Sequence, residues 1–177
     1  MMIISLIGFM GCGKSSVGRK LSELLCCPFM DLDDIIEKES GKSIPEIFET
    51  EGEEAFRAME VGMLSATLSQ FRTTASQSKV TMVLSLGGGT VMNPECAGLV
   101  HENTRCIYLK ASVDTLVENL KDESEGRPML RSSSSLRDRI DELMALRSST
   151  YESTAHIIID TDGRTINDIA GAIYRDV

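Results

Sequence analysis

A glycine-rich segment near the start of the chain has the residue types and spacing of a phosphate-binding loop. It reads Gly8-Phe9-Met10-Gly11-Cys12-Gly13-Lys14-Ser15 and fits the pattern G-x-x-x-x-G-K-S/T. In that pattern the glycines let backbone N–H groups curl around phosphate oxygens, the lysine reaches the outer phosphates, and the last hydroxyl binds Mg²⁺. An amphipathic stretch, Lys14 to Leu25, follows, so a bound phosphate would lie at a helix N-terminus. A strand-to-helix turn that merely needs glycine is the minor alternative.

Two carboxylates follow the next apolar run. Asp31 and Asp33 alternate with Leu32 at a predicted strand end, which would point both side chains to one side of the sheet, beside the loop. Asp31 could then hold Mg²⁺ directly or through water, and Asp33 could accept a proton from an attacking hydroxyl. A helix-capping role is the alternative for Asp33. Asp34, with Glu37 three residues later, is typical of a capping box.

Three glycines and two arginines could bind a second ligand. Gly87-Gly88-Gly89 follows an apolar run, and glycines at the carboxyl end of a strand let the backbone approach a ligand closely. Arg57 and Arg147 stand on predicted helices, and arginine suits a bidentate grip on a carboxylate. The alternatives are a surface salt bridge from Arg57 to Glu60, which we weigh equally with ligand binding, and a helix-dipole role for Arg147.

The elements that must position these residues alternate between strand and helix. Apolar runs typical of strands are Ile3–Ile7, Pro28–Leu32, Val80–Leu86, Arg105–Leu109 and His156–Asp160. Helical periodicity marks the stretches Glu53 to Ser69, Val113 to Leu120 and Ile166 to Tyr174. This alternation predicts a parallel sheet covered by helices.

One polar segment, 121–131, interrupts that alternation and is interpreted as a mobile lid. It contains Gly126, Arg127 and Pro128, and a hinged segment that carries arginine can exclude water during phosphoryl transfer. An ordinary solvated connection is the alternative. We expect 72–79 to be a surface loop and 132–135 to be a helix entry.

Composition restricts the class of protein. The chain has 177 residues, of which 42% are hydrophobic and 25% charged, as expected of one domain, 1–177, with a substantial core. Its formal charge of −9 argues against nucleic acid as a partner and requires local cations for any anionic ligand. Five cysteines without metal-ligand spacing indicate reduced thiols in a cytoplasm, and no segment is typical of export or of a membrane span. Cys12 is either a reactive thiol or, as we favour, a small side chain tolerated in a tight loop.

Taken together, these motifs resemble those of the shikimate kinase family over nearly the whole chain. The matching segments, in order, are Gly8 to Ser15, Asp31-Leu32-Asp33, Gly41 to Phe48 with Gly52-Glu53 and Phe56-Arg57, Leu84 to Gly89, Arg127-Pro128-Met129-Leu130, and Arg147 with Tyr151 and Ala155. The resemblance implies an α/β fold of the P-loop, nucleoside-monophosphate-kinase-like type. This fold is a three-layer sandwich with a central five-stranded parallel sheet of order 2-3-1-4-5 and a mobile lid.

The resemblance also implies an activity, with ATP and shikimate as partners and Mg²⁺ as cofactor. The γ-phosphoryl of ATP would pass to the 3-hydroxyl of shikimate, on the route to chorismate and aromatic amino acids, in a cytoplasmic monomer. Catalytic roles would fall to Asp33, Lys14 and Arg127, and shikimate would be bound by Asp33, Arg57, Gly87, Gly88, Gly89 and Arg147. The nucleotide would contact Gly11, Cys12, Gly13, Lys14, Ser15, Ser16, Arg127 and Arg164, and the metal would be held by Ser15 and Asp31.

The chain departs from the family pattern in places. Lys121 stands where an arginine commonly stacks on adenine, and an ammonium group cannot stack in that way. Met129 replaces a usual leucine at nearly equal volume. Arg164 lies either near the adenine or in a plain turn. The competing functions are another small kinase, such as a gluconate kinase, which would not need Arg57, Gly88 and Arg147, and a nucleotide-binding switch module, which could dispense with Asp33 and Arg127.

Overall fold

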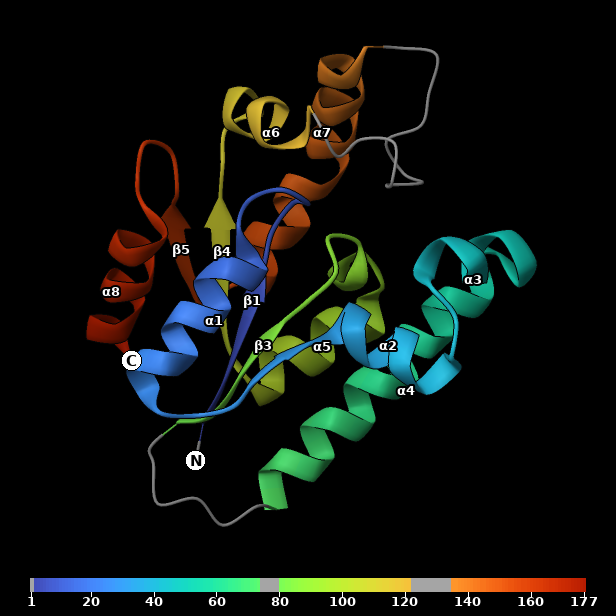
Figure 1. Ribbon diagram of the computed structural model, residues 1–177, viewed down its shortest axis with the longest axis horizontal. Helices are drawn as coiled ribbons and strands as arrows, with labels where there is room; N and C mark the ends of the chain where they lie inside the picture. Colours follow the sequence, from blue (N-terminus) through green and yellow to red (C-terminus); the bar gives the residue numbers. More distant parts are fainter. Residues whose placement is uncertain (1, 74–79, 122–134) are drawn as a thin grey trace.

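Five parallel strands form the centre of the protein in a computed structural model that describes residues 2–73, 80–121 and 135–177 (Figure 1). The strands are β1 (Met2–Ile7), β2 (Phe29–Asp31), β3 (Val80–Ser85), β4 (Arg105–Lys110) and β5 (Ile157–Asp160). They pair in the order β2-β3-β1-β4-β5, every pair parallel, which confirms the predicted sheet. The predicted lid lies outside the described residues except for Lys121.

Helices cover both faces of the sheet and complete three layers (Figure 1). They are α1 (Lys14–Leu25), α2 (Leu32–Ser40), α3 (Ile44–Thr50), α4 (Gly52–Thr73), α5 (Pro94–Asn103), α6 (Val113–Leu120), α7 (Leu136–Thr154) and α8 (Ile166–Asp176), with a 3-10 turn, η1 (Thr90–Met92). None of the described helices is long and apolar enough to cross a membrane. Ser135 is the N-cap of α7, which confirms the predicted helix entry there. The surface loop predicted for 72–79 is wrong at its start, because α4 continues to Thr73, and 74–79 lies outside the described residues.

Alternate residues of the strands supply two hydrophobic clusters, one on each face of the sheet. Ile4 and Leu6 of β1 pack with Val17 and Leu21 of α1 and with residues of α8. Ile3 and Ile7 point to the other face, where α2, α4, α5 and the carboxyl half of α7 contribute. This period of two along β1 is what a strand buried on both faces requires.

The start of α2 corrects two predictions. The strand β2 ends at Asp31, and Leu32 already belongs to α2, so the strand alternation that we expected to orient Asp33 is absent. The N-cap is Asp31, whose side chain accepts a hydrogen bond from the Asp33 N–H, so the predicted Asp34–Glu37 capping box is wrong. The side chain of Glu37 instead accepts from the Ile44 N–H and so ties α2 to the start of α3.

Candidate active site

The glycine-rich loop joins β1 to α1 at the carboxyl end of the central strand. Gly8, Gly11 and Gly13 have φ values of 142°, 79° and 92°, a region that favours glycine. Helix α1 begins at Lys14, so its first N–H groups face the space above the sheet. The ammonium of Lys14 curls over the loop and donates to the carbonyl oxygens of Gly8 and Phe9, each at 2.9 Å. The loop thus presents backbone donors and a cation on one side, the arrangement that binds phosphate.

Ser15 and Asp31 meet beside this loop and have the chemistry of a Mg²⁺ site. The Ser15 hydroxyl donates to Oδ2 of Asp31 at 2.7 Å, so two hard oxygen donors from neighbouring elements lie together. Mg²⁺ prefers oxygen ligands and is usually held by one or two protein groups, with waters and substrate phosphates completing its shell. Within the described ranges there is no cluster of three or more metal-ligating side chains. The donor set therefore fits a metal shared with a nucleotide.

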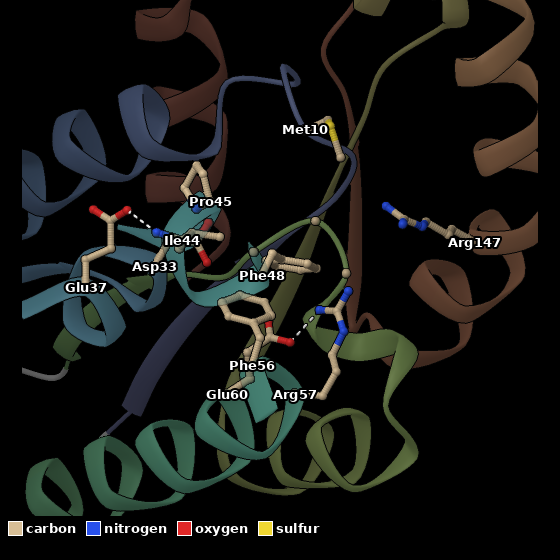
Figure 2. A pocket seen from close by; sticks show the side chains of 13 residues that line it. Met10, Asp33, Glu37, Ile44, Pro45, Phe48, Phe56, Arg57, Glu60 and Arg147 are labelled. Atoms are coloured by element: carbon tan, nitrogen blue, oxygen red, sulfur yellow. Dashed lines mark hydrogen bonds and ion pairs between the residues drawn. The ribbon is translucent and has the colours of Figure 1, made fainter. Parts of the chain in front are cut away.

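Two cavities open above the carboxyl ends of the strands. The first, about 480 Å³, lies over the glycine-rich loop and is lined by Lys14, Ser15, Ser16 and Asp31, among others. The second, about 260 Å³, lies between α2, α3, α4 and α7 (Figure 2). Both are lined by Met10, Asp33, Gly87 and Gly88. Among the described lining residues Asp33 is the one ionisable group that the two cavities share, so it stands where two ligands would meet.

Arg147 brings a buried cation to the second cavity. Its side chain extends from α7 into the pocket opposite Asp33 (Figure 2), and the residue is only 5% exposed. Its Nη1 atom is buried and has no hydrogen-bond partner among the described residues. A buried guanidinium N–H without a partner is costly, and a ligand carboxylate would satisfy it. The geometry therefore favours ligand binding over the helix-dipole alternative.

Arg57 faces the same cavity from α4, and the pair that it forms with Glu60 differs from the predicted surface salt bridge. It pairs within its helix with Glu53 at 3.1 Å and with Glu60 at 2.5 Å. The second pair is not a surface salt bridge, because the Glu60 side chain is only 2% exposed and also accepts a 2.5 Å hydrogen bond from the Thr90 hydroxyl. The carboxylate of Glu60 thus fixes the guanidinium in place at the cavity wall (Figure 2).

The glycine triplet makes room for these charged groups. A Cβ atom at Gly87 would lie 2.8 Å from Oδ1 of Asp33, and one at Gly89 would lie 2.9 Å from both terminal nitrogens of Arg57. Side chains at these positions would push the acid and the cation out of the pocket. The Gly88 carbonyl accepts a 2.5 Å hydrogen bond from the Tyr151 hydroxyl, which holds the turn against α7. Close approach of the chain's own groups therefore accounts for these glycines, and the predicted approach of their backbone to a ligand stays a prediction.

The surroundings of Asp33 shift its acidity. Burial and, to a smaller extent, the negative charges of Asp31 and Glu60 together raise the pKa of its carboxyl to about 7, against the cation of Lys14. A carboxyl that titrates near neutral pH is suited to exchange a proton with a substrate hydroxyl.

The structure brings most of the predicted site residues together, with some exceptions. Cys12 is buried in the core at 5% exposure, which favours the small-side-chain interpretation over the reactive thiol. Arg127 lies outside the described residues. Arg164 occupies the turn between β5 and α8 and donates to the carbonyl oxygens of Asp160 and Asp168, away from both cavities. Lys121 pairs with Glu118 at 2.6 Å.

The sequence analysis did not identify the roles that Glu60 and Asn119 have in the site. The sequence analysis predicts Glu60 only as a surface partner of Arg57. Its place four residues from both Phe56 and Leu64 puts an acid inside an apolar helix stripe, and that pattern could have indicated its burial. Asn119 lines the cavity above the loop and donates from Nδ2 to the Gly11 carbonyl at 2.9 Å. No spacing in the sequence points to Asn119.

Comparison with known proteins gives one consistent family. The family model for shikimate kinase matches residues 10–177. A shikimate kinase of Dictyoglomus turgidum is 38% identical over 174 residues, which cover 97% of this chain and 95% of that protein. One from Francisella tularensis subsp. holarctica is 36% identical over 170 residues, with 96% and 91% covered.

Solved structures agree with these relatives. Shikimate kinase from Acinetobacter baumannii in complex with shikimate superposes with a TM-score of 0.88 at 31% identity, over 99% of this chain and 92% of that one. The enzyme from Aquifex aeolicus gives a TM-score of 0.78 at 30% identity, with 99% and 95% covered.

Proposed function

This chain belongs to the shikimate kinase family, and we propose on that premise that it transfers the γ-phosphoryl group of ATP to the 3-hydroxyl of shikimate. The observation that carries the proposal is the placement of Asp33 at the wall shared by two cavities. One cavity has the phosphate-binding loop, and the other has two arginines and an apolar wall. That arrangement supports a reaction between a nucleotide and a small carboxylate with a hydroxyl group.

In the proposed complex the chain orients both reactants. Arg147 and Arg57 would bind the carboxylate of shikimate, and the backbone of Gly88 would approach the ring. The N–H groups of Gly11 and of Gly13 to Ser16 would surround the β- and γ-phosphates, with Lys14 against the transferred group. Arg127 would add a second cation there. Positioning and charge neutralisation account for most of the rate enhancement in phosphoryl transfer.

The chemical step would then be a single displacement. The 3-hydroxyl oxygen bonds to the γ-phosphorus as the bond from that phosphorus to the β–γ bridging oxygen breaks, and Asp33 accepts the hydroxyl proton. Ser15 and Asp31 would hold Mg²⁺, which neutralises charge on the phosphate oxygens when bound. Products are shikimate 3-phosphate and ADP.

The five cysteines are all unpaired, which supports a reducing compartment such as the cytoplasm. We also propose that the protein is a monomer.

ADP release with Mg-ATP and shikimate, gluconate or no acceptor tests the proposal. We expect release that depends on shikimate. In Arg147→Ala kcat/KM for shikimate should fall about 10- to 100-fold, because a charged hydrogen-bond partner is lost. Arg147→Lys keeps the charge without the bidentate fork and should lie between.

The matched control is Arg175→Ala, which removes an exposed arginine in the last turn of α8 and should behave like the parent protein. Turnover with gluconate alone would assign the chain to a different small-molecule kinase. Release that ignores the acceptor in every variant would point to a nucleotide-binding module.

A further inference from the structure

The last turn of α6 packs on the tip of the phosphate-binding loop through two consecutive residues. Leu120 is fully buried, and its Cγ would lie 2.7 Å from a Cβ placed at Gly11. Asn119, one residue earlier, donates from Nδ2 to the carbonyl oxygen of Gly11 at 2.9 Å. The helix is also fixed at its other end, because the N–H of Ser112, its N-cap, donates to the Asp162 carboxylate at 3.0 Å.

The contact from Asn119 holds a particular peptide group of the loop. The peptide that joins Gly11 to Cys12 accepts at its oxygen from Asn119 and donates at its nitrogen to the Phe9 carbonyl at 3.3 Å. Rotation of this peptide would break both hydrogen bonds. Gly11, with φ of 79°, has a backbone that would otherwise rotate easily. The side chain of Asn119 therefore limits the conformations of the loop just before the N–H groups of Gly13 to Ser15.

We propose that Asn119 is a positioning residue for nucleotide binding: its side-chain amide holds the Gly11–Cys12 peptide so that the loop keeps its phosphate-binding shape. This inference rests on the proposed nucleotide site, but not on the identity of the phosphoryl acceptor. Asn119 lies outside the G-x-x-x-x-G-K-S/T pattern, and α6 brings it to the loop from a distance of 108 residues along the chain. Its exposed position in the cavity above the loop permits substitution without damage to the core.

Binding of ADP and of inorganic tripolyphosphate to the intact chain tests this role. In Asn119→Ala the dissociation constants of both ligands should rise about three- to tenfold, the effect of one lost hydrogen bond. Asn119→Asp should weaken both further, because a carboxylate would face the Gly11 carbonyl and the phosphates. Asn119→Gln keeps the amide and should recover part of the affinity. The dissociation constant of shikimate, measured without nucleotide, and the thermal midpoint should stay at the parent values.

The control is Asn167→Ala, which removes an exposed asparagine in the first turn of α8, outside the lining of both cavities, and should leave both affinities unchanged. Weaker ADP binding with unchanged tripolyphosphate binding would overturn the inference, because Asn119 would then contact the nucleoside instead of shaping the loop. Unchanged binding of both ligands would also overturn it. If the parent chain binds ADP but does not phosphorylate shikimate, the acceptor assignment fails while this test still decides the role of Asn119.

Discussion

Asp33 is a half-buried carboxyl group that lies close to other negative charges. It lies in the first turn of α2, next to Asp31 and across Gly87 from Glu60. Removal from water and these two carboxylates raise its pKa to about 7, while Lys14 opposes the shift. The residue is therefore about half ionised at neutral pH, which suits a group that must accept a proton during the reaction.

This acidity predicts the pH dependence of the reaction. Asp33 must be ionised to accept the hydroxyl proton, so kcat/KM for shikimate should be constant above its pKa of about 7 and fall tenfold per pH unit below it. Asp33→Asn should lower kcat about 100- to 10,000-fold and remove this acid limb. Initial rates between pH 5.5 and 9 measure both effects.

The control for this profile is Asp34→Asn, which removes an exposed neighbouring charge and should keep the acid limb.

Stability should respond to Asp33→Asn in the opposite direction to activity. The folded-state pKa of Asp33 exceeds its usual value of 3.8, so its ionisation destabilises the fold as pH rises through about 7. The variant should therefore have a higher free energy of unfolding than the parent protein at pH 8. A lower free energy of unfolding would contradict the raised pKa of Asp33.

At the scale of elements, three consecutive strands of the sheet place the site. The phosphate-binding loop follows β1, helix α2 with Asp33 follows β2, and the glycine triplet follows β3. Because these strands are parallel and adjacent in the order β2-β3-β1, their carboxyl ends lie together. Alternation of apolar runs with helical stretches predicts a parallel sheet covered by helices. The strand order that brings these three carboxyl ends together follows only from the resemblance to the shikimate kinase family.

What the sequence could not predict depends on side-chain geometry within and between elements. Strand alternation predicts that the side chains of Asp31 and Asp33 lie on one face of the sheet. In the structure a three-residue strand is followed at once by α2, so Asp31 is the N-cap of that helix and accepts a hydrogen bond from the Asp33 N–H. Local periodicity cannot show whether a helix begins one or three residues after a strand. The contact from Asn119 to Gly11 joins α6 to a loop 108 residues away, which no local pattern encodes.

A pair of histidines, His101 of α5 and His156 between α7 and β5, should respond to acid. The rings of His101 and His156 stack with centroids 4.5 Å apart, and Nδ1 of His156 accepts the Cys106 N–H at 3.1 Å. Burial lowers the pKa of His156 below its usual 6.5, and His101 and Arg105 lower it further. The neutral ring is favoured in the fold, so its stabilising effect is complete above pH 6.5 and is lost as pH falls through the lower folded-state pKa.

We therefore expect the parent protein to lose more stability than His156→Asn between pH 7 and pH 5. Urea unfolding at several pH values measures this loss, and NMR titration of the imidazole signals gives the pKa directly. His101→Asn should move the pKa of His156 upward, because one of the groups that lower it is removed. A His156 pKa at or above 6.5 in the parent protein would contradict the assigned environment.

At the scale of the whole molecule, charge and packing have different distributions. The chain carries a net charge of −9, whereas Lys14, Arg57 and Arg147 converge on the two cavities. Anionic substrates would thus be held by a local cationic site within an acidic protein. The two hydrophobic clusters, in contrast, are spread over both faces of one sheet, and β1, β3 and β4 contribute buried residues to both.

Because the two hydrophobic clusters lie on opposite faces of the same sheet, we expect the protein to unfold as one cooperative unit. Leu84 and Leu109 are fully buried on opposite faces of the sheet, so Leu84→Ala and Leu109→Ala should each lower the free energy of unfolding by about 2–5 kcal/mol through lost burial and the cavity left behind. Leu146→Ala, at a position 74% exposed, is the control and should change it by less than about 0.5 kcal/mol. The chain has no tryptophan, and two of its three tyrosines, Tyr108 and Tyr151, are buried in the cluster that contains Leu84. Tyr174 on α8 is already 49% exposed, so the change in tyrosine fluorescence on unfolding reports mainly on the face with Leu84. If the molecule is one cooperative unit, the fluorescence transition in urea should coincide with the transition by circular dichroism even in Leu109→Ala, whose cavity is on the other face. Separate midpoints in that variant would show that the two faces of the sheet unfold independently.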